Sequence, residues 1–255
     1  MAVKGLDQDR VFLITGGIGG IGLGVAQTLL EYGSRVVVTD VVGEEGADEV
    51  ARLGAGDRVR YVDLDVTDPE AAESVADQLE ADGWPVFGLM ANAGVAPTSP
   101  TVDYPDDTWR TTVDINLNGV FWTVRSFGRR MVERGEGAII LTSSIAGLRV
   151  VSPETHVAYG ATKAAVAHMA SLLGVEWAKE GVRVNALAPG YTDTSILDAI
   201  REESPETIEE WKHRTPLGRL IQPEEIGQAA AFLFSDLASG ITATTLSVDG
   251  GYAAR

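Results

Sequence analysis

The sequence predicts one α/β domain in which a parallel sheet of about seven strands is covered by helices on both faces. Short apolar runs rich in β-branched residues alternate with helix-length segments over all 255 residues. Such alternation is typical of βαβ units, because parallel strands need a crossover connection. Hydrophobic residues make up 45% of the chain, enough for a core on each side of a sheet. No linker, repeat or low-complexity stretch interrupts the pattern, so we expect a single domain over residues 1–255.

The individual elements can be assigned in order from their residue patterns. Apolar, β-rich runs predict strands at residues 11–15, 35–40, 58–65, 86–94, 137–143, 182–189 and 244–251. Longer amphipathic or alanine-rich stretches predict helices at about 20–32, 44–53, 68–82, 106–133, 157–180 and 223–235, with further helical pieces within 194–213. Asp68 followed by Pro69 is a typical helix start, because aspartate caps the first turn and proline suits its first position.

The chain is strongly acidic, with 37 Asp and Glu against 20 Lys and Arg and a formal net charge of −17. Nucleic acids and anionic membranes attract basic proteins, so neither is an expected partner. The absence of cysteine excludes a disulfide framework and a zinc–cysteine site, and it fits a reducing cytoplasm. The first ten residues lack the features of a signal peptide. The three histidines show no ligand spacing, so we expect no metal site.

Two interpretations of the acidic excess remain open. The basic residues include only four lysines, Lys4, Lys163, Lys179 and Lys212. One interpretation is a salt-adapted protein whose acidic surface stays hydrated in brine. The other is a genome rich in G and C that favours arginine, with an acidic surface of no special meaning.

A glycine cluster follows the first predicted strand, where residues 15–22 read TGGIGGIG. Glycines allow the backbone to turn at positive φ and to approach a pyrophosphate closely. The helix that follows offers free N–H groups and the positive end of its dipole to phosphates. With a strand before it and a helix after it, the cluster predicts a dinucleotide site in a Rossmann-type doubly wound sheet.

Asp40 ends the second predicted strand and indicates which dinucleotide binds. A carboxylate there can accept hydrogen bonds from both ribose hydroxyls of an adenosine, and it would repel a 2′-phosphate. Neither Thr39 nor Val41 and Val42 supplies the cation that a 2′-phosphate needs. We therefore expect NAD rather than NADP.

Two further segments end predicted strands at the same edge of the sheet, where open α/β folds bind ligands. Asp65 and Val66 follow the third strand, where the carboxylate could bind the adenine amino group or merely cap a turn. Asn92, Ala93 and Gly94 end the fourth strand, where Asn92 could serve the cofactor or bond between neighbouring strands.

Tyr159 and Lys163 lie four residues apart, on one face of a predicted helix. A free tyrosine has a pKa of about 10, too high for a base near neutrality. A nearby ammonium group, together with the positive nicotinamide ring of NAD⁺, favours phenolate and is expected to lower that pKa, so that Tyr159 could take a proton from a substrate hydroxyl. The Ser144 hydroxyl could bond the substrate oxygen, and Asn116 could anchor a water linked to the lysine. A surface Tyr–Lys pair is the plain alternative.

With these motifs the sequence resembles the short-chain dehydrogenase/reductase family from about Val11 to Gly251. The resemblance implies a catalytic tetrad of Asn116, Ser144, Tyr159 and Lys163, with Ser143 structural, and a nicotinamide segment in residues 189–194. The cofactor residues it implies are Gly16, Gly19, Gly20, Ile21, Gly22, Asp40, Asp65, Val66, Asn92, Ala93, Gly94, Tyr159, Lys163, Pro189, Gly190, Thr192 and Thr194. Ala91 and Gly19 depart from common family residues without putting activity in doubt.

The loop of residues 149–156, between Ser144 and Tyr159, is slightly longer than is common in the family. This loop and the expected NAD preference resemble the polyol- and sugar-oxidising branch. Besides Ser144 and Tyr159, the candidate substrate contacts are Glu154, His156 and Trp211, and a solvated loop is equally compatible with the residues. Residues 194–213 should form a mobile lid after the nicotinamide segment.

The sequence therefore predicts NAD-dependent interconversion of a secondary alcohol and a ketone, on a polyol, sugar or sugar acid. The alternatives are a reductase of 3-oxoacyl, steroid or aromatic ketones, and a non-catalytic nucleotide-sensing or scaffold protein. The helices 106–133 and 158–173 resemble the surfaces through which family members form tetramers, so a homotetramer or a dimer is expected.

Overall fold

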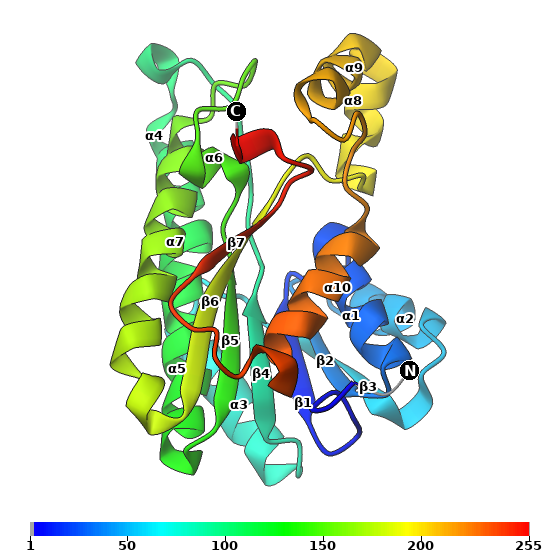
Figure 1. Ribbon diagram of the computed structural model, residues 1–255, viewed down its shortest axis with the longest axis vertical. Helices are drawn as coiled ribbons and strands as arrows, with labels where there is room; N and C mark the ends of the chain where they lie inside the picture. The colour runs from blue at the N-terminus through cyan, green and yellow to red at the C-terminus, as the bar shows by residue number, and fades with distance from the viewer. Residues whose placement is uncertain (1–2, 255) are drawn as a thin grey trace.

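Seven strands lie side by side in one parallel sheet, in the order β3-β2-β1-β4-β5-β6-β7 (Figure 1). The computed structural model describes residues 3–254. The strands are β1 (Val11–Thr15), β2 (Arg35–Asp40), β3 (Val59–Asp63), β4 (Val86–Ala91), β5 (Gly137–Thr142), β6 (Val182–Pro189) and β7 (Thr245–Val248). Because β1 lies between β2 and β4, the winding reverses beside it, and open α/β sheets bind ligands at such a switch point. The predicted fold class is confirmed.

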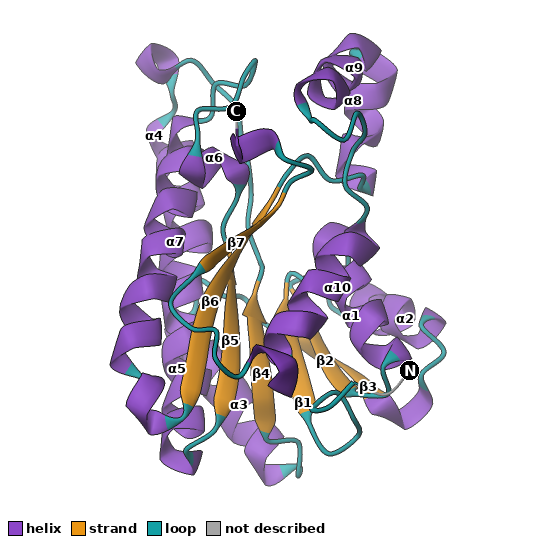
Figure 2. Cartoon of the chain, in the orientation of Figure 1, coloured by secondary structure: helices purple, strands orange, loops and turns teal. Residues whose placement is uncertain are grey.

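Helices cover both faces of this sheet (Figure 2). The main helices are α1 (Gly20–Glu31), α2 (Glu44–Arg52), α3 (Pro69–Ala81), α4 (Asp106–Val113), α5 (Val120–Arg134), α6 (Ile145–Leu148), α7 (Val157–Glu176), α8 (Asp198–Glu203), α9 (Pro205–Arg214) and α10 (Pro223–Phe234). Helices α1, α2 and α10 pack on one face, and α3, α5 and α7 pack on the other.

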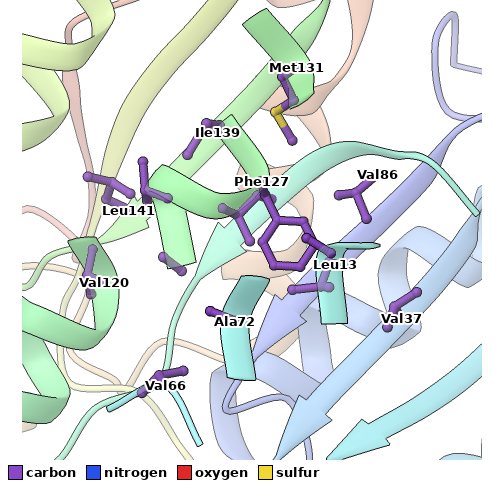
Figure 3. Packing of buried hydrophobic residues seen from close by; sticks show 14 of the residues in the cluster. Leu13, Val37, Val66, Ala72, Val86, Val120, Phe127, Met131, Ile139 and Leu141 are labelled. Atoms are coloured by element: carbon purple, nitrogen blue, oxygen red, sulfur yellow. The ribbon is translucent and has the colours of Figure 1, made fainter. Parts of the chain in front are cut away.

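Alternate residues of the strands supply the two cores. Leu13 of β1 lies beside Phe127 of α5 in the cluster on one face, which also includes Met131 (Figure 3). Its neighbours Phe12 and Ile14 point to the other face and meet α1 and α10. This two-sided burial explains the nearly continuous apolar runs of the central strands, since neither face of a covered parallel sheet meets water.

The predicted helix over residues 106–133 is continuous but not uniformly α-helical. Between α4 and α5 the chain forms a π-helical turn at Asp114–Gly119. Such turns widen the helix locally and are frequent at functional sites. The predicted helix 157–180 ends at Glu176 and continues as a short 3-10 turn at Ala178–Glu180, and the short α6 was not predicted.

Helices α8 and α9 lie beyond the carboxyl ends of the strands (Figure 1). They share a small core of their own, formed by Leu197, Ile208, Trp211 and Leu220 with Tyr191 and Ile200 packed against it. This places the segment 194–213 above the sheet edge, as a lid requires. Within residues 3–254, no helix combines the length and the apolar character that crossing a membrane would need.

Candidate active site

A cavity of about 990 Å³ opens at the carboxyl edge of the sheet, beside the switch point. Thirteen of the predicted site residues line it: Gly16, Gly19, Gly20, Ile21, Asp40, Asp65, Val66, Asn92, Ala93, Gly94, Tyr159, Lys163 and Thr194. The structure therefore brings together segments that are far apart in the sequence.

Other lining residues were missed by sequence reasoning. Most of them adjoin a motif and could have been found by that adjacency: Val41, Leu64, Thr67, Val95, Ala96, Thr142 and Ser195. Thr111, Asp114 and Ile115 come from the end of α4 and the π-helical turn. Asp114 and Ile115 could have been found because they lie next to Asn116, whereas Thr111 adjoins no motif.

The glycine turn lets two backbone segments come close. Gly16 has φ +60°, and a Cβ there would lie 2.7 Å from the Cα of Ala93. Gly22 is packed so closely that a Cβ would lie 2.3 Å from the Gly16 carbonyl oxygen. Asn92 fixes this approach, since its side-chain amide donates to the carbonyls of Thr15 (3.1 Å) and Gly16 (3.0 Å). Asn92 thus bonds across the strands, one of the two predicted alternatives.

Two carboxylates line the nucleotide end of the cavity. Asp40 accepts hydrogen bonds from the backbone N–H groups of Val41 (2.9 Å) and Ile18 (3.3 Å), which hold its carboxylate beside the glycine turn. Asp65 accepts from the N–H (2.9 Å) and hydroxyl (2.7 Å) of Thr67, so it caps a turn as well as lining the cavity.

Asn116 is fully buried and lies in the π-helical turn. Its amide group pairs with both backbone groups of Val95: the side-chain oxygen accepts from the N–H, and the side-chain nitrogen donates to the C=O, each at 2.8 Å. The same nitrogen donates to the hydroxyl of Thr162 at 3.3 Å. Asn116 therefore fixes the chain after β4 against α7, one residue from Lys163. Its expected role in a water relay stays a prediction.

Tyr159 and Lys163 lie on consecutive turns of α7, with the Lys163 ammonium nitrogen 5.7 Å from the centre of the Tyr159 ring. Lys163 is 3% exposed and donates to the Thr142 carbonyl at 2.7 Å. Its burial lowers the pKa of the ammonium group to about 8. Ser143 donates to the Lys163 carbonyl at 2.8 Å, in line with a structural role.

Burial raises the pKa of the Tyr159 phenol, and a hydrogen bond with Ser144 acts in the opposite direction. The expected lowering of this pKa requires the nicotinamide ring of NAD⁺ as well as the ammonium group, and it stays a prediction. The Ser144 hydroxyl also caps α6 by accepting from the N–H of Ala146 at 3.1 Å.

The remaining predicted residues lie around the cavity without lining it. Thr192 is buried, and its hydroxyl donates to the carbonyl of Gly190 at 2.9 Å. Gly190 packs against Asp249, with Pro189 at the end of β6. Of the predicted nicotinamide segment, only Thr194 reaches the cavity wall.

The candidate substrate residues have different surroundings. Glu154 accepts hydrogen bonds from Tyr191 and Trp211, and Trp211 is buried in the core of the lid. His156 lies beside the candidate base, with its ring 5.1 Å from that of Tyr159. Its Nε2 atom is buried and has no hydrogen-bond partner in the part of the chain that the structure describes. Whether these side chains contact a substrate stays a prediction.

A nicotinamide dinucleotide fits these surroundings. The cavity volume is at the upper end of the range for cofactor sites. Helix α1 begins at Gly19 with no side-chain cap, and a Cβ at Gly19 would meet no atom within 4 Å. The first N–H groups of α1 are thus available to a pyrophosphate. Asp40 and Asp65 would face the adenosine, and Tyr159, Lys163 and Thr194 would face the nicotinamide.

Comparisons with known proteins agree with this arrangement. A family model of the short-chain dehydrogenase/reductase class, described as enoyl-(acyl carrier protein) reductase, matches residues 16–253. Galactitol 2-dehydrogenase (L-tagatose-forming) of Cereibacter sphaeroides is 42% identical, over 94% of this chain and 93% of the relative. Cis-4-hydroxycyclohexanecarboxylate dehydrogenase of Sinomonas cyclohexanicum is 40% identical, over 96% and 97%.

A solved structure is also similar over its full length. Gluconate 5-dehydrogenase of Burkholderia cenocepacia, in complex with NADP and tartrate, has a TM-score of 0.90 and 32% identity, covering 98% of this chain and 99% of that chain. Matches of this extent show that the chain belongs to the short-chain dehydrogenase/reductase family and is an oxidoreductase acting on CH–OH groups.

Proposed function

We propose that this oxidoreductase uses NAD to oxidise a secondary alcohol of a polyol, sugar or sugar acid. The observation that carries the proposal is the meeting of Tyr159, Lys163 and Asp40 along one cavity, with the candidate base at one end and a carboxylate at the other. When bound, the cofactor supplies the acceptor for the hydride.

The roles of the residues follow from their positions. Tyr159 Oη takes the proton of the substrate hydroxyl, and the charge of Lys163 favours the phenolate that forms. Ser144 orients the substrate oxygen through the hydroxyl that already bonds Tyr159. Asn116 bonds both Val95 and Thr162 of α7, and so keeps the chain after β4 in place beside Tyr159 and Lys163. Replacing Tyr159 by Phe is expected to abolish turnover while cofactor binding, measured by calorimetry, persists. Near-normal turnover would refute this assignment.

The preference for NAD rests on charge. The described lining of the cavity contains three carboxylates, Asp40, Asp65 and Asp114, and a single cation, Lys163, which lies at the catalytic end. A 2′-phosphate beside Asp40 would therefore meet like charge without a partner. The gluconate 5-dehydrogenase structure contains NADP. A preference of this chain for NAD would therefore differ from the cofactor bound in that structure. Titration of both cofactors decides the point, and tighter binding of NADP would refute the proposal.

The substrate class is supported by the relatives named for galactitol and gluconate oxidation. His156, with its buried and unpartnered nitrogen beside Tyr159, is the best-placed side chain for a second substrate hydroxyl. A panel of polyols, aldoses and sugar acids with NAD should give the highest kcat/KM on one of these. Exclusive activity on 3-oxoacyl or steroid ketones would refute it.

A second candidate substrate class is the cyclic hydroxy acids. It is favoured by the similarity to cis-4-hydroxycyclohexanecarboxylate dehydrogenase, whose named substrate carries a secondary alcohol on an apolar ring. The same panel, extended by cyclohexanols with and without a carboxylate, separates the two candidates.

We also propose a homotetramer, or a dimer, formed through α4–α5 and α7. Apolar side chains are exposed on these helices, among them Trp109, Phe121, Leu172 and Val175. Chains with a net charge of −17 repel one another, and salt screens this repulsion to within about 3 Å at 1 M. Light scattering should therefore detect more tetramer in molar salt than in dilute buffer; an unchanged distribution would contradict a salt-adapted surface.

A cytoplasmic location is part of the proposal and is supported by the cysteine-free sequence. Cell fractionation with an antibody against the chain would test it, and recovery in a secreted fraction would refute it.

A further inference from the structure

Glu154 lies in the loop that joins the two catalytic segments. The loop of residues 149–156 follows α6, which Ser144 caps, and leads directly into α7, which carries Tyr159. A displacement of this loop would therefore move the start of α7, where Tyr159 is the third residue.

The carboxylate of Glu154 is held from the lid side by two donors. Oε2 accepts a hydrogen bond from the Tyr191 hydroxyl at 3.0 Å, and Oε1 accepts one from the Trp211 indole N–H. These bonds span 37 and 57 residues of sequence. The rings of Tyr191 and Trp211 are stacked, with centroids 4.4 Å apart and planes 9° from parallel.

Trp211 belongs to the small core of the lid, and Tyr191, in the predicted nicotinamide segment, packs against that core. Trp211 is 5% exposed and packs with Leu197, Ile208 and Leu220. Burial, the largest cause, raises the pKa of Tyr191, so this phenol stays a neutral donor at ordinary pH. Among the described residues, these are the only side-chain hydrogen bonds between the loop 149–156 and the segment 191–214.

We propose that Glu154 is a positioning residue that ties the lid to the catalytic loop, so that closing the lid and placing Tyr159 occur together. This inference rests on the proposed function, because it assigns Glu154 to the closure of the same site. It replaces the expectation that Glu154 binds substrate directly: a carboxylate holding two lid donors shapes the site through Tyr191 and Trp211.

A double-mutant cycle distinguishes the two roles. E154A removes the acceptor, and W211F removes the indole N–H while keeping an aromatic ring in the lid core. With a substrate that the enzyme turns over, each single variant should lower kcat/KM about tenfold, mainly through KM, with the Kd of NAD unchanged. The double variant should be no worse than the weaker single variant. E154Q, which keeps one acceptor oxygen, should stay within about threefold of the wild type.

A matched control is E209A, which removes an exposed carboxylate of α9 that, among the described residues, pairs with Lys212 alone. It should leave kcat/KM unchanged. An independent readout is trypsin cleavage within the lid at Arg201, which should be several-fold faster in E154A than in E209A. This readout needs no turnover, so it still tests the tie if the proposed substrate class is wrong.

Three results would overturn the inference. They are wild-type kcat/KM in E154A, effects of E154A and W211F that multiply in the double variant, or a loss in E154A confined to substrates with additional hydroxyl or carboxylate groups. The last would show that Glu154 contacts the substrate itself.

Discussion

Replacing Asn116 by Ala tests whether the π-helical turn holds the site together. Asn116 is 0% exposed and makes three hydrogen bonds, two to the backbone of Val95 and one to the hydroxyl of Thr162. Each such bond contributes about 1 kcal/mol net. Because Val95 is partly exposed, water can reach its freed backbone groups, and we add no further penalty for unpaired groups. The expected loss in the free energy of unfolding is about 3 kcal/mol.

For a chain of this size, 1 kcal/mol lowers the melting temperature by about 2–4 °C, so N116A should melt about 6–12 °C below the wild type. Thermal unfolding followed by circular dichroism measures this difference. The control is N118A in the same turn, whose side chain, within residues 3–254, bonds only the exposed Asp114 at 2.8 Å. N118A should change the melting temperature by less than about 2 °C. Equal shifts in the two variants would refute the reasoning, because the loss would then belong to the turn and not to the contacts of Asn116.

Three further predictions concern charge and recognition. Burial lowers the pKa of Lys163 from 10.5 to about 8. The unfolded chain therefore binds more protons between pH 8 and 10.5, and stability from this group rises with pH across that window. The substitution K163M should therefore remove about 3 kcal/mol of destabilisation below pH 8. Its gain in melting temperature over the wild type should become smaller towards pH 10.5. A difference in melting temperature that does not depend on pH would contradict this prediction. The substitution D40A should raise the Kd of NAD at least about tenfold and the Kd of NADP by a smaller factor, measured by calorimetric titration. An equal rise in both Kd values would show that Asp40 does not select between the two cofactors. The substitution H156L should lower kcat/KM for a polyol more than for a mono-alcohol. The control is H168L, on the exposed face of α7. Equal losses of kcat/KM on both substrates would show that His156 does not recognise the substrate.

Much of the fold could be predicted, because each central strand is buried on both faces and reads as an apolar run. The runs at β1 and β2 were assigned to the residue, and β6 likewise. The π-helical turn could not be predicted. Its residues, Asp114–Gly119, continue the pattern of the flanking helix, and the contact made within the turn joins Asn116 to Val95, 21 residues earlier in the chain.

The nucleotide end and the substrate end of the candidate site differ in how far the sequence could predict them. The nucleotide residues lie at strand ends or in a glycine turn, so local position in the sequence already predicts where they meet. Glu154, in contrast, is bonded to partners 37 and 57 residues away, and no spacing rule relates a loop glutamate to a lid tryptophan. Sequence reasoning therefore selected Glu154 as a candidate substrate contact and could not predict its two hydrogen bonds to Tyr191 and Trp211.

The acidic composition bears directly on the chemistry of Tyr159. Burial already raises the pKa of this phenol, and a chain of net charge −17 surrounds it with a field that further opposes a phenolate. Within the described cavity lining, Lys163 is the one cation, and at a pKa of about 8 it is still protonated near neutrality. As pH rises through 8, Lys163 loses the charge that the phenolate needs, while the phenol itself is still protonated. We therefore expect the proposed activity of Tyr159 as a base to fall on the alkaline side through loss of the Lys163 charge.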